Sequence, residues 1–271
     1  MRWRLLWGGC GLLWGRRRWC APSSSGGIGL LWSLCEGARM KLVLAFHGTR
    51  DARGLAVCAA VAGRVQELVD VPVVVAYADV LEPSVRSVVD SPCVVVPVFL
   101  AAGYHVRVDI PEQVGGRAGV VVTPPLGLDA VPAVRERLVE VGVRAGDSVV
   151  LAAAGSSDVS ALATVRRAAE MVGACAVGYV ATASPRIADV VAGLSGRVVI
   201  ASWLLAPGVF HSSLAASGAE LVSEPVGDHP LVVAALVRRY WEAVGRVPGV
   251  SSPCEGGSVG SRRMSGVAIG A

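Results

Sequence analysis

The chain has 271 residues and a formal net charge of +4, and 53% of its residues are hydrophobic. This hydrophobic content is enough to build packed cores, which excludes an intrinsically disordered protein. Residues 1–39 hold six arginines and one acidic residue, so the rest of the chain is close to neutral. Without a broad basic face, the chain is not expected to bind nucleic acid.

The sequence also predicts where the protein resides. No apolar run reaches the roughly 18 residues that a membrane-spanning helix needs, so no membrane partner is expected. The seven cysteines form no C-x-x-C or zinc-like spacing, which favours a reducing, cytoplasmic location. Three of them lie in apolar stretches and are predicted to be buried, unreactive thiols: Cys58, Cys93 and Cys175.

The two ends of the chain differ in composition from the middle. Five of the seven tryptophans lie within residues 1–39, among Arg, Gly and Ser. An apolar stretch there resembles part of a signal peptide, but three arginines follow it directly, which argues against export. We therefore expect translation to begin at Met40 and residues 1–39 to be a mis-assigned start, with a targeting leader as the alternative. Residues 246–271 are rich in Gly and Ser and are predicted to be a flexible tail.

Between these ends, short Val-rich runs alternate with segments of helical length. Continuous apolar runs of this length are typical of parallel strands that helices cover on both faces, so the sequence predicts an α/β fold. Residues 52–69 show the periodicity of an amphipathic helix, and Asp51 is placed to be its N-cap. The predicted strands are, in chain order, KLVLAF (41–46), VPVVVAY (71–77), CVVVPVF (93–99), GVVVTP (119–124), SVVLAAA (148–154), ACAVGYVA (174–181), RVVIAS (197–202) and ELVSEP (220–225).

The second four strands repeat the pattern of the first four. Four sequence blocks recur in the same order at an offset of about 100 residues, which indicates an internal duplication. The sequence thus predicts two tandem flavodoxin-like parallel-sheet domains, at residues 40–143 and 144–245. The matching blocks are HGTRD (47–51) with AGSSD (154–158), AYADVLEPS (76–84) with GYVATASPR (178–186), FLAAGYH (99–105) with LLAPGVF (204–210), and PLG (125–127) with PVG (225–227).

The two copies differ in the polar side chains that follow three of their strands. His47, Asp79 and His105 come after the first three strands of the first copy. Ligands of open parallel sheets collect beyond these carboxyl ends, and two imidazoles with a carboxylate suit a divalent transition metal. Either imidazole can also accept a proton near neutral pH. All three side chains are lost in the second copy, whose matching residues are Ala154, Ala181 and Phe210.

Simpler roles are open for these and other polar residues. A histidine at a strand end is often a cap or a hydrogen-bonded core residue, and Asp79 could cap a helix that begins near Pro83. We expect His211 on the surface and His229 in a turn before the last helix. The serines of AGSSD have no paired base, so helix capping explains them better than a nucleophilic role.

The blocks AFHGTRD, ADVLEPS and VVPVFLAAGYHVRVDIP resemble the sirohydrochlorin chelatase family, the class II chelatases of siroheme and cobalamin biosynthesis. The resemblance covers roughly residues 41–245 and is strongest over 41–127. It implies an ATP-independent lyase that inserts Fe²⁺, or alternatively Co²⁺, into sirohydrochlorin, with the metal as a substrate and no tightly bound cofactor. His47 and His105 match the family's two active-site histidines, and Asp79, as third metal ligand, lies where many members have Glu.

The resemblance also implies how the tetrapyrrole is held. Sirohydrochlorin carries many carboxylates, so arginines near the site are candidates to anchor it, with solvated surface charge as the alternative for each: Arg50, Arg53 and Arg107. The second copy, which lacks the three ligands, would then form the opposite wall of the substrate-binding cleft, giving one active site per chain. A noncatalytic tetrapyrrole or metal carrier is the alternative function, and turnover distinguishes the two. A nucleotide-binding domain is disfavoured because no G-x-G-x-x-G follows the first strand.

Overall fold

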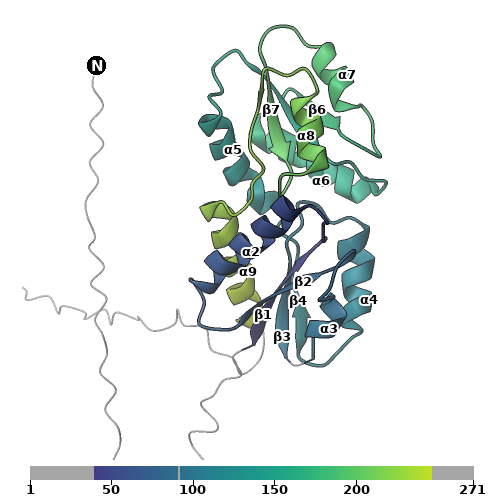
Figure 1. Cartoon of the computed structure of the whole chain (residues 1–271), viewed down its shortest axis with the longest axis vertical. Helices are drawn as coiled ribbons and strands as arrows, with labels where there is room; N and C mark the ends of the chain where they lie inside the picture. The colour runs from purple at the N-terminus through teal and green to yellow at the C-terminus, as the bar shows by residue number, and fades with distance from the viewer. Residues whose placement is uncertain (1–39, 91, 246–271) are drawn as a thin grey trace, which may run out of the picture. The chain divides into compact units, whose positions relative to one another are not determined.

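Figure 1 shows the computed structural model, which describes residues 40–90 and 92–245. The expectations for residues 1–39 and 246–271 lie outside these described residues. The described strands form two parallel sheets of four, ordered β2-β1-β3-β4 and β6-β5-β7-β8, which confirms the predicted duplicated α/β fold. The strands are β1 (Lys41–Phe46), β2 (Val73–Tyr77), β3 (Cys93–Pro97), β4 (Val120–Val122), β5 (Ser148–Ala153), β6 (Ala176–Tyr179), β7 (Val198–Trp203) and β8 (Leu221–Val222).

Helices connect the strands in both repeats. α2 (Ala52–Gln66) begins after Asp51, whose side chain accepts a hydrogen bond from the backbone N–H of Arg53, as the sequence predicts for an N-cap. α6 (Val159–Val172) begins in the same way after Asp158. None of the described helices is both long and apolar enough to cross a membrane. The others are α3 (Val85–Val88), the π-helical turn η1 (His105–Asp109), α4 (Ile110–Val114), the 3-10 turn η2 (Gly127–Ala130), α5 (Val131–Glu140), α7 (Ile187–Ala192), α8 (Val209–Ala215) and α9 (Pro230–Val244).

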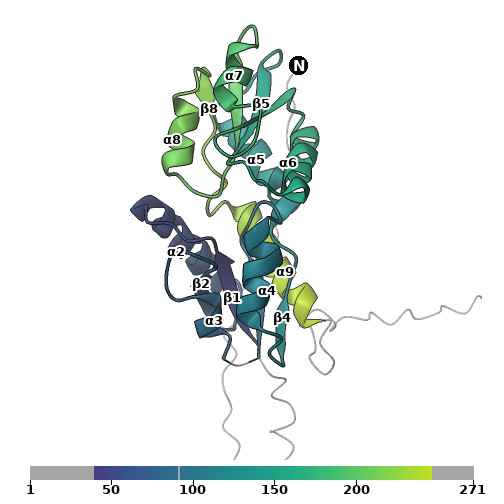
Figure 2. The ribbon, with the colours of Figure 1, turned by 90° about the vertical axis from the view of Figure 1, so that its right-hand side faces the viewer.

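Each sheet is covered by helices on both faces, which can be followed in Figure 2. Successive side chains of β1 alternate between the faces: Leu42 and Leu44 pack with α2 and α9, whereas Val43 and Ala45 pack with α3 and α4. The second sheet lies between α5 and α6 on one face and α7 and α8 on the other. Burial on both faces explains why the strands read as continuous apolar runs.

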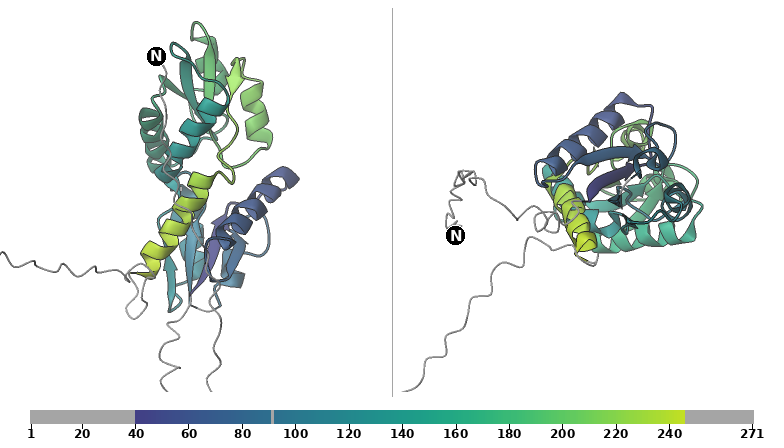
Figure 3. Two further views of the ribbon diagram at one scale, coloured as in Figure 1. Left: turned by 90° about the vertical axis from the view of Figure 1, so that its left-hand side faces the viewer. Right: turned by 90° about the horizontal axis from the view of Figure 1, so that it is seen from below.

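The last helix of each repeat packs on the sheet of the other repeat. α5 contacts β7 and α6, whereas α9 contacts β3 and α2 and lies along the first sheet in Figure 3. The hydroxyl of Tyr240 in α9 donates to the carbonyl of Met40, just before β1, at 2.7 Å. Arg64 in α2 pairs with Asp228, just before α9, at 2.9 Å between Nε and Oδ2. The boundary predicted at residues 143–144 falls between α5 and β5, so α5 belongs to the first repeat by sequence and to the second sheet by packing.

The cysteines are buried less uniformly than the sequence predicts. Cys58 and Cys93 are buried, and burial raises the pKa of the Cys58 thiol to about 11. The prediction for Cys175 is wrong, because its thiol is exposed and contacts the Val149 carbonyl at 3.2 Å. Cys175 precedes β6, an edge strand with a neighbour on one side only, so its apolar sequence context does not bury it.

Candidate metal site

The first three strands of the chain deliver their following residues to one edge of the sheet. β1 pairs in parallel register with both β2 and β3. Backbone pairing continues past the strand ends, where the N–H of Asp79 donates to the carbonyl of His47 at 3.1 Å. The η1 turn after β3 begins with His105. Parallel topology therefore places all three predicted ligands beyond the carboxyl ends of neighbouring strands.

His47, Asp79 and His105 lie close enough together to share one metal ion. Each offers one ligand atom, and these atoms all lie within 4.8 Å of one another. The two imidazole rings meet edge to face, with centroids 4.4 Å apart and planes at 85°. His47 and Asp79 are exposed, and His105 is half-buried. Two nitrogens and a carboxylate oxygen at this spacing suit a divalent transition metal, and the exposure leaves room for a further ligand.

Gly48 allows the two loops that carry His47 and Asp79 to approach each other. Its φ is 101°, in the left-handed region that glycine tolerates best. A Cβ added to Gly48 would lie only 2.2 Å from the backbone oxygen of Asp79. The close contact explains why a glycine follows His47. A side chain at this position would push away the loop that carries Asp79 and separate its carboxylate from the histidine.

His47 presents a defined ring nitrogen to the site. Its Nδ1 lies 2.9 Å from the carbonyl oxygen of Gly48. Because a carbonyl oxygen can only accept a hydrogen bond, Nδ1 carries the proton in the neutral ring, and Nε2 keeps its lone pair. The lone pair of Nε2 is then the one available to a metal ion or a proton.

His105 has an acidic partner that was not among the predicted site residues. Its Nδ1 lies 2.5 Å from Oδ2 of Asp109, four residues further along η1. Two aromatic rings flank the imidazole, those of Phe99 at 6.4 Å and Tyr104 at 6.2 Å between centroids. The sequence signal that could have found Asp109 is its spacing of four residues from His105 within GYHVRVDIP.

Asp79 does not cap a helix. α3 begins at Val85, and its N-cap is Ser84, so the capping alternative for Asp79 is wrong. One carboxylate oxygen of Asp79 accepts a hydrogen bond from the N–H of Val80 at 2.7 Å. This bond orients the carboxylate at the edge of the sheet, next to the two histidines.

The three predicted substrate-binding arginines differ in how they are paired. The Arg53 guanidinium holds both carboxylate oxygens of Asp51, at 2.8 and 3.1 Å, and these hydrogen bonds lower the pKa of that carboxyl. Arg107 reaches the second repeat, where it pairs with Asp158 at 3.0 Å. Arg50 is exposed and takes part in none of the ion pairs found among the described residues.

The other polar residues named from the sequence have structural roles. His211 is half-buried rather than fully exposed, and its Nε2 lies 3.1 Å from the Ser223 carbonyl. His229 is the N-cap of α9, and its Nδ1 accepts a hydrogen bond from the N–H of Leu231. Ser156 accepts a hydrogen bond from the N–H of Asp158, the residue that caps α6. Ser156 also lies close to the loop that carries His105, because a Cβ added to Gly103 would be 3.9 Å from its Oγ.

The corresponding loops of the second repeat keep the backbone but not the ligands. Gly155 has a φ of 98°, and a Cβ on it would lie 2.0 Å from the backbone oxygen of Ala181. The N–H of Ala181 donates to the carbonyl of Ala154 at 2.8 Å, as the N–H of Asp79 does to His47. Among the described residues, no group of three or more potential metal ligands occurs in this repeat.

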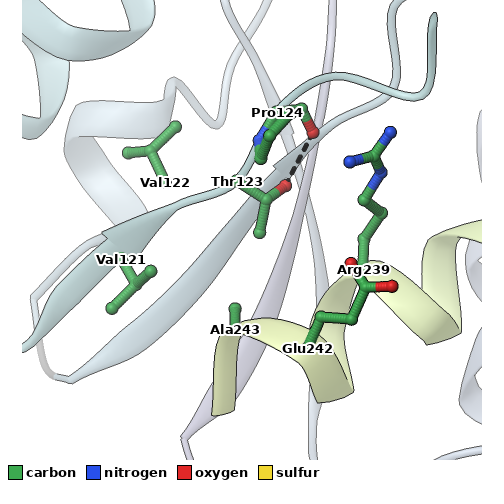
Figure 4. Close-up of a pocket in the computed structure, with 7 residues that line it drawn as sticks. All are labelled: Val121, Val122, Thr123, Pro124, Arg239, Glu242 and Ala243. Carbon is green, nitrogen blue, oxygen red and sulfur yellow. Dashed lines mark hydrogen bonds between the residues drawn. The ribbon is translucent and has the colours of Figure 1, made fainter. Parts of the chain in front are cut away.

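A small pocket lies apart from these loops, between β4 and α9 (Figure 4). Its walls combine apolar side chains with Arg239 and Glu242 of α9. Arg239 pairs with Asp129 at 2.8 Å, and the Thr123 hydroxyl donates to the Pro124 carbonyl at 2.9 Å. None of the predicted site residues lines this pocket.

Duplicated parallel sheets with two histidines and a carboxylate at one carboxyl edge define a chelatase-like α/β protein. The chain belongs to the CbiX family, whose model matches residues 41–141 and, a second time, residues 148–243. These matches confirm the family predicted from the sequence and its presence in two tandem copies.

Two solved structures have a similar fold. One is CbiX, described as the terminal enzyme of siroheme biosynthesis in denitrifying bacteria, with 22% identity and a TM-score of 0.56 over 76% of this chain and 99% of that chain. The other is a multi-domain protein from Deinococcus radiodurans with structural similarity to chelatases and two additional novel domains. It shares 20% identity and a TM-score of 0.55 over 75% of this chain and 55% of its own, so this chain spans about half its length. No curated protein matches the chain.

Proposed function

We propose that the protein is a sirohydrochlorin chelatase that inserts Fe²⁺ by preference, and Co²⁺ as the alternative, into the tetrapyrrole without ATP. The observation that carries the proposal is the meeting of His47, Asp79 and His105 ligand atoms within 4.8 Å, in a chain of the CbiX family. A structural metal site would be closed by four protein ligands, whereas this one offers three and is exposed.

The exposed site suits a metal that must be passed on. A cation held by three side chains keeps open coordination positions, through which the four ring nitrogens can take it over. As the cation leaves, the Nε2 lone pairs of His47 and His105 become free. Each can then accept one of the two pyrrole N–H protons, so that insertion of one M²⁺ releases two H⁺ and charge balances.

Arg50 is the first candidate to anchor a carboxylate of the substrate. It is exposed and engaged in no ion pair among the described residues, so its binding to a substrate carboxylate displaces nothing. Arg53 and Arg107 hold Asp51 and Asp158, and each would have to exchange one carboxylate for another. We therefore assign the anchoring role to Arg50 before the other two.

The second repeat supplies the wall on the other side of the macrocycle in this proposal. A Cβ on Gly208 would lie 3.6 Å from Oδ2 of Asp51, so the start of α8 is next to the start of α2. Val209 and Phe210, the first residues of α8, are exposed apolar side chains, 76% and 44% accessible. Exposed apolar groups of this kind suit contact with the flat face of a tetrapyrrole. Phe210 stands where the first repeat has His105.

The test is anaerobic incubation of the full chain with sirohydrochlorin and Fe²⁺ or Co²⁺, followed by the absorption change of the macrocycle. We expect many metallated products per chain, with most of the rate lost in His47→Ala and in His105→Ala. His211→Ala is the matched control, since it removes an imidazole from the second repeat, and it should keep the wild-type rate. Binding of one macrocycle or one metal per chain without turnover would instead support a carrier. Full activity in both histidine variants would show that the proposed site is wrong.

A further inference from the structure

We propose that Asp109 is a positioning residue that fixes the ring orientation and tautomer of His105, so that Nε2 of His105 faces the metal. This inference rests on the proposed function of the site, but it concerns an interaction that can be measured without substrate. Asp109 touches His105 and acts through it.

The contact between the two side chains fixes which nitrogen of His105 faces Asp109. Oδ2 of Asp109 lies 2.5 Å from Nδ1 of His105, so the two atoms are in direct hydrogen-bond contact. A carboxylate can only accept a hydrogen bond, so in the neutral ring Nδ1 carries the proton and Nε2 keeps its lone pair. A carboxylate in this position both orients an imidazole ligand and strengthens the donor character of its other nitrogen.

The local backbone holds Asp109 in place. His105 and Asp109 are the first and last residues of η1, and a separation of four residues puts both side chains on the same face. Ile110, which follows Asp109, is fully buried against the sheet, and Pro111 fixes the start of α4. The two side chains are only 29% and 23% exposed, so solvent competes little for their contact.

The two histidines of the site reach the same tautomer by different means. Nδ1 of His47 is held by the backbone carbonyl of Gly48, which no side-chain substitution removes. Nδ1 of His105 depends on the Asp109 side chain. In the second repeat, where Phe210 replaces the histidine, the residue four positions later is the buried Leu214. The acid is therefore present only in the repeat that has an imidazole to orient.

The experiment compares wild type with Asp109→Ala, Asp109→Asn and Glu112→Gln in the metal-free full chain labelled with ¹⁵N. Long-range ¹H–¹⁵N spectra report which ring nitrogen of each histidine carries the proton, with signals assigned from the His47→Ala and His105→Ala spectra. Glu112→Gln removes one exposed acid three residues further along and is the matched charge control.

We expect protonated Nδ1 on both histidines in wild type and in Glu112→Gln. In Asp109→Ala, the proton of His105 should move to Nε2 while His47 stays unchanged, and Asp109→Asn should keep the wild-type tautomer because its amide oxygen can still accept. The Co²⁺ affinity of Asp109→Ala should fall by about 10- to 100-fold, with Asp109→Asn in between.

These outcomes separate the inference from the proposed function. Suppose that the wild-type chain does not metallate sirohydrochlorin, but Asp109→Ala changes the His105 tautomer and lowers the Co²⁺ affinity. This result would disprove the enzymatic function and support the role of Asp109. Turnover in wild type, with an unchanged His105 tautomer and unchanged Co²⁺ affinity in Asp109→Ala, would overturn the role of Asp109 alone.

Discussion

The two repeats can be compared loop by loop at the carboxyl edges of their sheets. Gly48 and Gly155 have φ angles of 101° and 98°, and each sits against the backbone oxygen of the loop that follows the next strand. Both of those loops contain a cis proline, Pro83 or Pro185. The backbone of these two loops is thus alike in both repeats, while among the described residues a group of three potential metal ligands occurs only in the first. The backbone geometry of these loops therefore does not depend on the presence of the ligand side chains.

The third loop shows where the repeats diverge in backbone as well. In the first repeat, β3 is followed by the π-helical turn η1, which carries His105 and Asp109. In the second repeat, β7 is followed by α8, an α-helix whose first turn contains Phe210. π-helical turns are frequent at functional sites, and this one coincides with the repeat that has the ligands. At this third position the two repeats therefore differ in backbone as well as in side chains.

The largest effect should come from removing a ligand of the first repeat. His47→Ala and His105→Ala should each lower the chelation rate by about 100-fold or more, since a positioned imidazole contributes 10²–10⁴ to a reaction with proton transfer. The measurement is the initial rate with sirohydrochlorin and Co²⁺, alongside circular dichroism to show that the fold is kept. A loss of less than threefold in either variant, with an intact fold, would contradict the account.

The glycines of the two repeats should respond alike in stability and differently in metal binding. An alanine at residue 48 or 155 would clash with backbone and strain a positive φ, so each variant should lose about 1–3 kcal/mol of unfolding free energy in urea. Only Gly48→Ala displaces a loop that carries a ligand, so only it should weaken Co²⁺ binding. Equal loss of Co²⁺ affinity in Gly48→Ala and Gly155→Ala would contradict the claim that only the first repeat binds the metal.

Arg50 should have a smaller effect, confined to substrate binding. Arg50→Ala should raise the KM for sirohydrochlorin about two- to fivefold and leave kcat unchanged, as expected for one exposed ion pair. Arg167→Ala, which removes an exposed arginine on α6 that pairs with Glu170, is the control. An unchanged KM in Arg50→Ala, or an equal rise in Arg167→Ala, would reassign Arg50 to the solvated surface.

The smallest effect is expected when the ligands are transplanted. The triple variant Ala154→His, Ala181→Asp, Phe210→His should bind a second Co²⁺ per chain, but more weakly than the first, because α8 replaces the η1 turn. Isothermal titration with Co²⁺ measures both stoichiometry and affinity. A second site as tight as the first would mean that the third loop does not matter, and the role given to η1 would be wrong.

Much of this arrangement can be predicted from the sequence because it depends on local patterns. Uniform apolar runs reveal the strands, Asp51 marks the start of α2, and parallel topology brings the strand ends together. From these alone, His47, Asp79 and His105 are expected at one edge, as the structure finds them.

The remainder depends on information that no local pattern contains. α5 and α9 are amphipathic helices, and nothing in their periodicity tells which sheet each will cover, so their exchange between the repeats could not be predicted. The pairing of Arg107 with Asp158 joins residues of different repeats for the same reason. Asp109 was missed because the contact with His105 depends on the turn geometry of η1, although their spacing is visible in the sequence.

The central claim is that the first repeat alone holds the cation, through His47, Asp79 and His105. Anomalous diffraction at the cobalt edge from crystals of the full chain soaked in Co²⁺ tests it most directly. The account predicts one strong peak about 2.0–2.2 Å from Nε2 of both histidines and from a carboxylate oxygen of Asp79. A cobalt peak elsewhere on the protein with none between these three side chains would contradict it.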